Sequence, residues 1–198
     1  MKNRHSIRLK WFDYTSNGAY FVTICTQNRE YLFGDVVNRK METNTLGNLV
    51  VSIWESLPDR FPVIIDTYQI MPNHFHGIII IDNSVGAPLV GALDLGRVQD
   101  PPLRKITLGN IIAYFKYQST KQINNVGVGY SDPNNIGREN NNIRRENPAP
   151  TEYQKIFQRN YYEHIIRNEK DLNKISQYIM DNPLMWERDR NNPENIYV

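Results

Sequence analysis

The residues with the most evident chemistry are two histidines, His74 and His76, in the segment 71–77 (MPNHFHG). Side chains at positions i and i+2 of a strand point to the same face of the sheet, so the two imidazoles are expected side by side. Two imidazole nitrogens at that spacing suit one divalent cation. A hydrogen-bonded histidine pair with a structural role is the alternative that this spacing leaves open.

The last predicted helix carries the next group of candidate residues. It runs from about Asn168 to Asp181, and Asn168 suits its start because an asparagine side chain accepts hydrogen bonds from the free N–H groups there. Apolar residues recur along it at helical spacing and form one stripe, which we expect to face the core: Leu172, Ile175 and Ile179.

Tyr178 and Asn182 fall on the rim of this stripe, one helical turn apart, when about 100° of rotation is assigned to each residue. Asp181 falls on the side away from the core. Pro183 is expected to end the helix at Asn182, because the residue before a proline is disfavoured in the α region. If the helix packs beside the histidine strand, Tyr178 and Asn182 reach the imidazoles. A rim tyrosine and a simple helix stop are the structural alternatives.

The elements that must position these residues follow from changes of hydrophobic period along the chain. Runs rich in β-branched and aromatic residues predict strands at 19–26, 63–71, 74–82 and 154–166, with Pro72-Asn73 as a hairpin turn. Helical spacing predicts helices at 46–57, between Thr45 as N-cap and Pro58 as stop, and at 107 to about 123. This order indicates an α+β fold: a ferredoxin-like split βαβ arrangement with helices packed on an antiparallel or mixed sheet, followed by the C-terminal helix.

The chain is expected to form a single domain over residues 1–198, because 198 residues with 40% hydrophobic content can bury one sizeable core. Residues 83–102 and 124–150 are rich in glycine, proline or asparagine without a regular period, which predicts loop insertions. Residues 1–10 form a basic arm that is either a solvated tail or a contact to phosphates; its cations are Lys2, Arg4, Arg8 and Lys10.

Composition narrows the class of protein. The net charge is only +2, and the 22% of charged residues are nearly balanced in sign, which argues against global disorder. Cys25 is the single cysteine, so a disulfide framework and a cysteine-based zinc cluster are excluded and a cytoplasmic location is expected. No apolar run reaches the roughly 20 residues that span a bilayer, and the basic start lacks the apolar stretch of a secretory signal, so we expect no membrane contact.

Several stretches together resemble the IS200-like Y1 transposases and, within them, the branch of REP-associated tyrosine transposases. The element His74-Phe75-His76 is similar to the HUH motif (histidine, hydrophobic residue, histidine) of that family. The resemblance covers roughly Trp11 to Trp186 apart from the two insertions. The other stretches that are similar to the branch are 18–26 (GAYFVTICT), 161–168 (YYEHIIRN) and 178–183 (YIMDNP).

The resemblance implies an enzyme that cuts single-stranded DNA next to a hairpin and joins strands without an external energy source. Tyr178 matches the nucleophilic tyrosine, which forms a 5′-phosphotyrosine in that family. His74 and His76 match its paired metal ligands, and Asn182 matches the third. The implied cofactor is Mg²⁺ or Mn²⁺. A homodimer with shared sites and a monomer both stay open.

Candidate DNA contacts come from basic residues next to tyrosines, which suit an unpaired strand whose bases stack and whose phosphates pair with cations. These residues are Lys116, Lys121 and Arg159. Two other functions are considered: a non-catalytic regulator that binds DNA hairpins with the same fold, and a metal-dependent hydrolase of small substrates. The joint presence of His74, His76, Tyr178 and Asn182 argues against the regulator, and a hydrolase would not need Tyr178.

Overall fold

A four-stranded antiparallel sheet forms the centre of the fold. The structure is a computed structural model that describes residues 17–82, 106–126 and 154–195. The strands of the sheet are β1 (Gly18–Cys25), β4 (Val63–Met71), β5 (His74–Ile81) and β6 (Tyr162–Ile166). Their spatial order is β4-β5-β1-β6 with every neighbouring pair antiparallel, which is the order of a ferredoxin-like split βαβ fold. The predicted α+β class is therefore confirmed.

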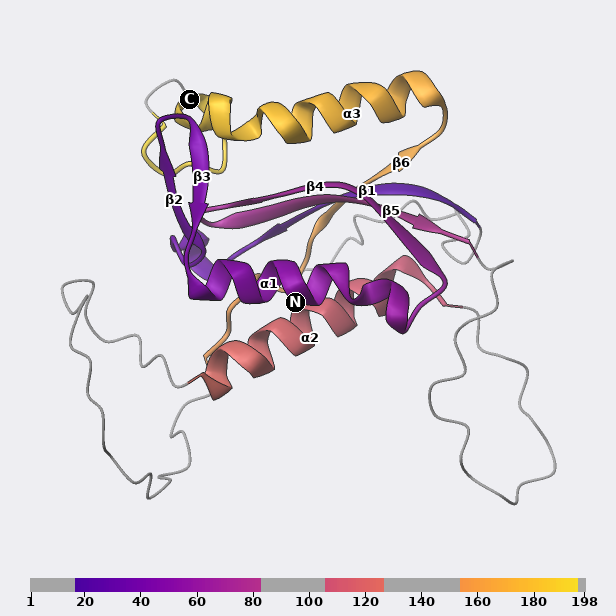
Figure 1. The fold of residues 1–198 in the computed structure, drawn as a ribbon, viewed down its shortest axis with the longest axis horizontal. Helices are drawn as coiled ribbons and strands as arrows, with labels where there is room; N and C mark the ends of the chain where they lie inside the picture. The colour runs from indigo at the N-terminus through magenta and orange to yellow at the C-terminus, as the bar shows by residue number, and fades with distance from the viewer. Residues whose placement is uncertain (1–16, 83–105, 127–153, 196–198) are drawn as a thin grey trace, which may run out of the picture.

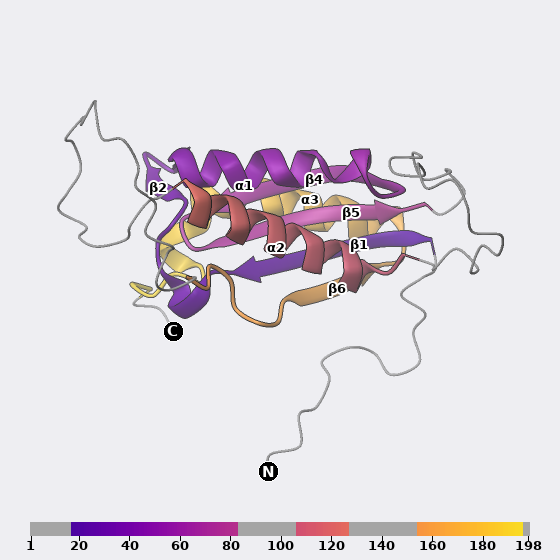
Figure 2. The same ribbon diagram turned by 90° about the horizontal axis from the view of Figure 1, so that it is seen from below.

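Helices cover both faces of this sheet. They are α1 (Thr45–Glu55), α2 (Leu108–Asn125) and α3 (Glu169–Asp181), with short 3-10 helices η1 (Gln27–Arg29), η2 (Leu57–Asp59) and η3 (Asn182–Arg188). Figure 1 shows α3 on one face and α1 and α2 on the other, and Figure 2 shows α1 and α2 side by side across the strands. None of the helices in the described ranges combines the length and apolar character needed to cross a membrane.

The larger core lies between the sheet and the pair of helices α1 and α2. Phe75 of β5 points into it, and its ring centroid lies 4.7 Å from that of Trp54 and 5.6 Å from that of Phe115. Gly77 follows on the same face and leaves the space that the Trp54 indole fills, because a β-carbon there would lie 2.6 Å from Trp54 Cζ2. Glycine at this position therefore lets α1 approach the sheet closely.

A smaller core lies between the sheet and α3. Because side chains alternate along a strand, His74 and His76 of β5 share the α3 face with Ile78. The apolar stripe predicted for the last helix packs here, so the predicted orientation of α3 is confirmed. The members of this cluster are Phe21, Ile78, Ile166 and Ile179, with Leu172 and Ile175 packed beside them.

The predicted boundaries of the first helix were wrong by a few residues. Asn44, and not Thr45, caps α1, since the Asn44 side chain accepts a hydrogen bond from the Gly47 N–H. The helix ends at Glu55, and Pro58 lies within η2 instead of stopping α1. The chain tightens into a 3-10 turn there, because a proline is tolerated in the first turn of a helix, where no N–H bond is required of it.

Two further differences concern loops. A two-stranded hairpin of β2 (Gly34–Val37) and β3 (Lys40–Thr43) lies beside the main sheet and was not predicted, since each strand has only four residues and little hydrophobic alternation. Helix α2 continues to Asn125, so the predicted insertion 124–150 begins too early. Residues 127–150 of it, the insertion 83–102 and the basic arm lie outside the described residues.

Strand β6 is much shorter than the predicted strand 154–166. It begins at Tyr162, and before it Phe157 forms an isolated bridge with Thr26. Between Phe157 and Tyr162 the chain has four residues opposite only two of β1, Ile24 and Cys25, so the ladder is interrupted there, and the carbonyls of this stretch face a lysine of α2. The Nζ of Lys116 donates to the carbonyls of Gln158, Arg159 and Asn160, at 2.5, 3.2 and 3.3 Å.

Replacing Lys116 with methionine should lower the free energy of unfolding by about 2 kcal/mol, because three carbonyls lose a charged donor. Burial lowers the pKa of Lys116 to about 8, as expected for an ammonium partly removed from water. Urea unfolding at neutral pH measures the loss. Lys121 is exposed on the same helix and serves as the control; its methionine variant should stay within about 0.5 kcal/mol of wild type. Equal losses in both variants would contradict a structural role for Lys116.

Candidate metal and nucleophile site

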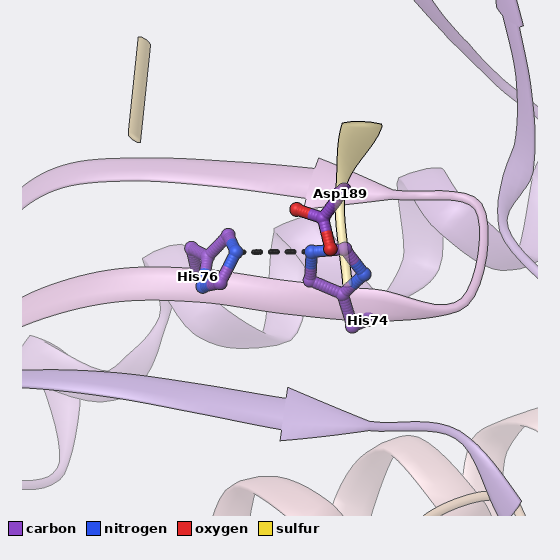
Figure 3. Close-up of side chains that lie close together, drawn as sticks. All are labelled: His74, His76 and Asp189. Carbon is purple, nitrogen blue, oxygen red and sulfur yellow. Dashed lines mark hydrogen bonds between the residues drawn. The ribbon is translucent and has the colours of Figure 1, made fainter. Parts of the chain in front are cut away.

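Two histidines face each other on the α3 side of the sheet. His74 and His76 are 0% and 1% exposed, and their Nε2 atoms lie 3.0 Å apart (Figure 3). Adjacent ligands of an octahedral ion, each about 2.1 Å from the metal, lie about 3.0 Å apart, whereas tetrahedral ligands lie about 3.4 Å apart. The 3.0 Å separation is that of an N–H···N hydrogen bond, and it also fits two neighbouring ligands of a six-coordinate cation.

The ring of His74 is held in one tautomer by Asn73. The Asn73 Nδ2 donates to the backbone carbonyls of Arg29 and Asn191, at 3.2 and 2.7 Å, so its Oδ1 faces His74 Nδ1 at 2.8 Å. An amide oxygen only accepts hydrogen bonds, so Nδ1 carries the proton and Nε2 keeps its lone pair. This is the tautomer that a metal-binding histidine requires.

The ring of His76 is oriented by a hydroxyl. The register of β1 and β5 places Thr23 opposite His76, and Thr23 Oγ1 lies 2.9 Å from His76 Nδ1. A hydroxyl both donates and accepts, so it supports either tautomer. Without a metal, His76 Nε2–H donates to His74 Nε2; in the other tautomer, the lone pairs of both Nε2 atoms face the space between the rings. The Thr23 hydroxyl can therefore hold His76 in the tautomer whose Nε2 has a free lone pair, which is the tautomer that binds a metal ion.

Both imidazoles are neutral at physiological pH. Burial lowers the pKa of His74 to about 4, the Asp189 carboxylate acts against this shift, and the Arg29 guanidinium adds to it. Burial also holds the pKa of His76 well below its usual value, and the charge of a protonated His74 would lower it further. Neutral imidazoles are the form that binds metal ions.

The metal-free protein should lose stability as the pH falls from about 6.5 to about 4. In this window a histidine of the unfolded chain takes up a proton, whereas folded His74, with its pKa of about 4, stays neutral. The unfolded state then binds more protons, so the free energy of unfolding decreases toward acid. His76 acts in the same direction, because burial also lowers its pKa. Urea unfolding in EDTA across this range measures the effect, and a flat profile would contradict it.

Tyr178 of α3 lies beside the histidine pair within the same chain. Its ring centroid is 5.4 Å from that of His76 and 6.1 Å from that of Phe21, and 48% of the residue is exposed. Burial raises the pKa of the phenol, the Asp189 carboxylate raises it further, and the Asn182 side chain partly opposes both. The phenol is therefore protonated at neutral pH and open to a substrate that approaches from solvent.

Asn182 brings a buried amide oxygen to the same place. The residue is 2% exposed, and its Oδ1 has no hydrogen-bond partner among the residues that the structure describes. Burial is the main cause of the pKa shifts of His74 and Tyr178. The Asn182 side chain also raises the pKa of His74 and lowers that of Tyr178, so it lies next to both groups. A buried acceptor without a partner calls for an explanation, and a bound cation is one.

The prediction that Pro183 takes Asn182 out of the helical conformation was wrong. Asn182 has φ −56° and ψ −44°, in the α region. Pro183 is accommodated because the chain changes there from α3 into the 3-10 helix η3, whose first turn needs no N–H from it. The continued helix keeps the Asn182 side chain turned inward, one turn after Tyr178.

Asp189 is a site residue that the sequence analysis missed. It follows η3 directly and is 9% exposed. The possible ligand atoms of His74, His76 and Asp189 all lie within 4.8 Å of one another (Figure 3). Asp189 lies beyond Trp186, where the family resemblance ends, and no regular spacing relates it to the histidines. We find no signal in the sequence that would have identified it.

The predicted DNA contacts are not part of this cluster. Lys116 and Arg159 line a cavity of about 270 Å³ together with Tyr117 and Lys155, whereas Lys121 does not line it. Helix α2, which contributes to this cavity, covers the sheet face opposite to α3 (Figure 1). The role of these three residues in DNA binding stays a prediction. The remaining predicted contacts lie outside the described residues: Lys2, Arg4, Arg8 and Lys10.

Comparison with known proteins found similar solved structures and a relative at the level of sequence. No protein-family model matches the chain. Among similar solved structures is a REP-associated tyrosine transposase bound to a REP hairpin, with 18% identity and a TM-score of 0.48, covering 92% of this chain and 74% of that one. Another is a candidate transposase of Deinococcus radiodurans R1, with 12% identity and a TM-score of 0.42, covering 88% of this chain and 97% of that one.

A relative with much higher identity comes from Haemophilus influenzae (strain Rd). This protein, described as uncharacterised, is 40% identical over 190 residues, which cover 95% of this chain and 92% of the relative. Identity at this level extends over nearly the whole of both chains, so it is not confined to one motif. The chain therefore belongs to the same protein family as the Haemophilus influenzae protein.

Proposed function

We propose that the chain is a Y1-type transposase that cleaves and rejoins single-stranded DNA next to hairpins. One observation carries this proposal: a phenol lies beside a histidine pair. The Tyr178 ring is 5.4 Å from that of His76, whose Nε2 is 3.0 Å from His74 Nε2. A nucleophile next to a cation site is what phosphodiester transesterification requires. All three residues belong to one chain, which supports a site formed within a single copy; a homodimer with shared sites stays the alternative.

The residues present fit a divalent metal ion. The proposed ligands are His74 and His76, with facing Nε2 atoms, and Asn182, with a buried oxygen that lacks a partner among the described residues. Nitrogen and oxygen donors at octahedral spacing suit Mn²⁺, and Mg²⁺ is the abundant alternative. When bound, the cation would polarise the scissile phosphate and offset charge that develops during the reaction.

Tyr178 performs the covalent step in this proposal. Its Oη attacks the phosphorus, a P–O bond to the tyrosine forms, and the P–O3′ bond breaks, which leaves a 5′-phosphotyrosine and a free 3′-OH. The phenol gives up its proton and the departing 3′ oxygen takes one up. Because burial raises the pKa of Tyr178, removal of this proton is part of the barrier. The phosphotyrosine retains the energy of the broken linkage, so another 3′-OH can reverse the step without water.

The proposed partner is single-stranded DNA with a hairpin, handled in the cytoplasm by a chain that acts as one domain. The cavity beside α2 offers a second surface for it, because cations and an exposed tyrosine meet there: Lys155, Arg159 and Tyr117. Mixed basic and aromatic surfaces bind unpaired strands through phosphate contacts and base stacking.

One assay separates this function from the two alternatives. The full chain is incubated with a 3′-labelled single-stranded hairpin oligonucleotide and Mn²⁺, and the products are resolved under denaturing conditions. A labelled covalent adduct with the protein supports the transposase. Hairpin binding without an adduct would support a non-catalytic regulator, and free cleavage products without an adduct would support a hydrolase. Either of these outcomes contradicts the proposal.

A further inference from the structure

We propose that Asp189 is a further ligand of the same metal ion, so that the segment after α3 completes the site. This inference rests on the proposed function, because it assumes a metal ion at His74 and His76. It goes beyond the family resemblance, which ends at about Trp186 and assigns no role to any residue after it.

The carboxylate of Asp189 has the position and burial of a ligand. One of its oxygens points toward the two imidazoles in Figure 3, and the possible ligand atoms of His74, His76 and Asp189 lie within 4.8 Å of one another. Only 9% of the residue is exposed, and such a carboxylate needs hydrogen bonds or a cation to replace its lost hydration. The Asn191 N–H donates to Oδ1 at 2.5 Å. We therefore assign Oδ2 to the metal.

The segment that carries Asp189 is fixed to the sheet by residues distant in sequence. Asn73 is central to this, because it contacts His74 through its Oδ1 and the segment through its Nδ2. The imidazole and the carboxylate are thus held by one shared side chain. Three donors reach the segment at 2.7 Å: Arg29 Nη1 to the Arg190 carbonyl, Tyr31 Oη to Asn192 Oδ1, and Asn73 Nδ2 to the Asn191 carbonyl.

The resulting donor set suits phosphoryl chemistry. Two imidazole nitrogens, the Asn182 amide oxygen and the Asp189 carboxylate would occupy four of about six octahedral positions, which leaves two for a phosphate oxygen and water. The carboxylate also supplies the one negative charge of the set, and charge–charge attraction strengthens the binding of a divalent cation in a buried place. Loss of Asp189 should therefore weaken metal binding and open one more position to water.

The test measures Mn²⁺ binding to the full chain without DNA, so that activity is not the readout. Asp189→Asn keeps the acceptor for Asn191 and removes the charge and the proposed ligand oxygen. Electron paramagnetic resonance of free Mn²⁺ should show at least tenfold weaker binding, on the order of known effects around metal sites. Pulsed measurements in deuterated water should count one additional water on the bound ion. Glu187→Gln removes an exposed acidic group two positions away and should change neither quantity.

Each outcome decides the assignment. Weaker binding together with an additional bound water supports Asp189 as a ligand. Unchanged affinity would overturn it, and weaker binding with unchanged hydration would also overturn it, because attraction at a distance explains that result. If wild type and Asp189→Asn bind Mn²⁺ equally while His76→Ala does not, the metal site of the proposed function stands and this inference alone fails. Absence of binding by wild type removes both.

Discussion

Replacing Tyr178 with phenylalanine should abolish the covalent protein–DNA adduct, while hairpin binding stays within about twofold of wild type. The variant lacks the only atom that can attack phosphorus in the proposed step. It keeps the ring that packs against His76 and Phe21, with centroids at 5.4 and 6.1 Å, so the fold of the site should persist. Denaturing electrophoresis with the 3′-labelled hairpin measures the adduct, and a native gel shift measures binding.

Tyr162 provides a matched control for this experiment. It is 48% exposed, like Tyr178, and its ring also lies 6.1 Å from that of Phe21. Tyr162→Phe should retain the adduct, because the contact with the His76 ring belongs to Tyr178. An adduct that survives in Tyr178→Phe and disappears in Tyr162→Phe would assign the nucleophile to Tyr162 instead.

Replacing His76 with alanine should weaken Mn²⁺ binding by at least about 100-fold, because the change removes a ligand and not merely a residue that supports one. The adduct should disappear with the metal, since the scissile phosphate then lacks a cation to offset its charge. The variant also breaks up the buried pair whose Nε2 atoms lie 3.0 Å apart. The loss of stability between about pH 6.5 and 4 should become smaller, because one histidine with a lowered pKa is gone.

His164→Ala separates these effects from the general loss of a histidine. The His164 side chain is 43% exposed and lies 3.0 Å from the carboxylate of Asp171 in α3. His164 is not among the residues that gather at the candidate metal site, so Mn²⁺ binding and adduct formation should stay at the level of wild type. Equal loss of Mn²⁺ binding in both variants would show that His76 has no special role.

The faces on which the candidate residues lie were predictable from the sequence because they depend on local geometry. A strand repeats every two residues, so His74 and His76 had to share a face and Phe75 had to occupy the other. A helix repeats every 3.6 residues, so the apolar stripe of α3 placed Tyr178 and Asn182 on one rim. The order of strands and helices then indicated the ferredoxin-like class, and all of this agrees with the structure.

Boundaries were less predictable, because they depend on partners outside the element. The predicted strand 154–166 satisfies local β-propensity, yet the ammonium of Lys116 accounts for the carbonyls of its middle part. The backbone of Asn182 similarly stays helical against the local preference that Pro183 imposes, because η3 continues the turn. A tertiary contact in the first case, and the continuation of the helix into η3 in the second, outweigh the local preference.

The sequence by itself determined that the two imidazoles share one face of β5 and that Tyr178 and Asn182 share one rim of α3; that α3 packs on the histidine face came from the tertiary structure. Only the tertiary structure decided how the site is completed. Asn73 joins His74 to a segment 118 positions away through its bond to Asn191, and that segment delivers Asp189. Periodicity describes residues a few positions apart, whereas contacts between distant segments exist only after the chain has closed the loops between them, at an entropic cost that no local pattern encodes.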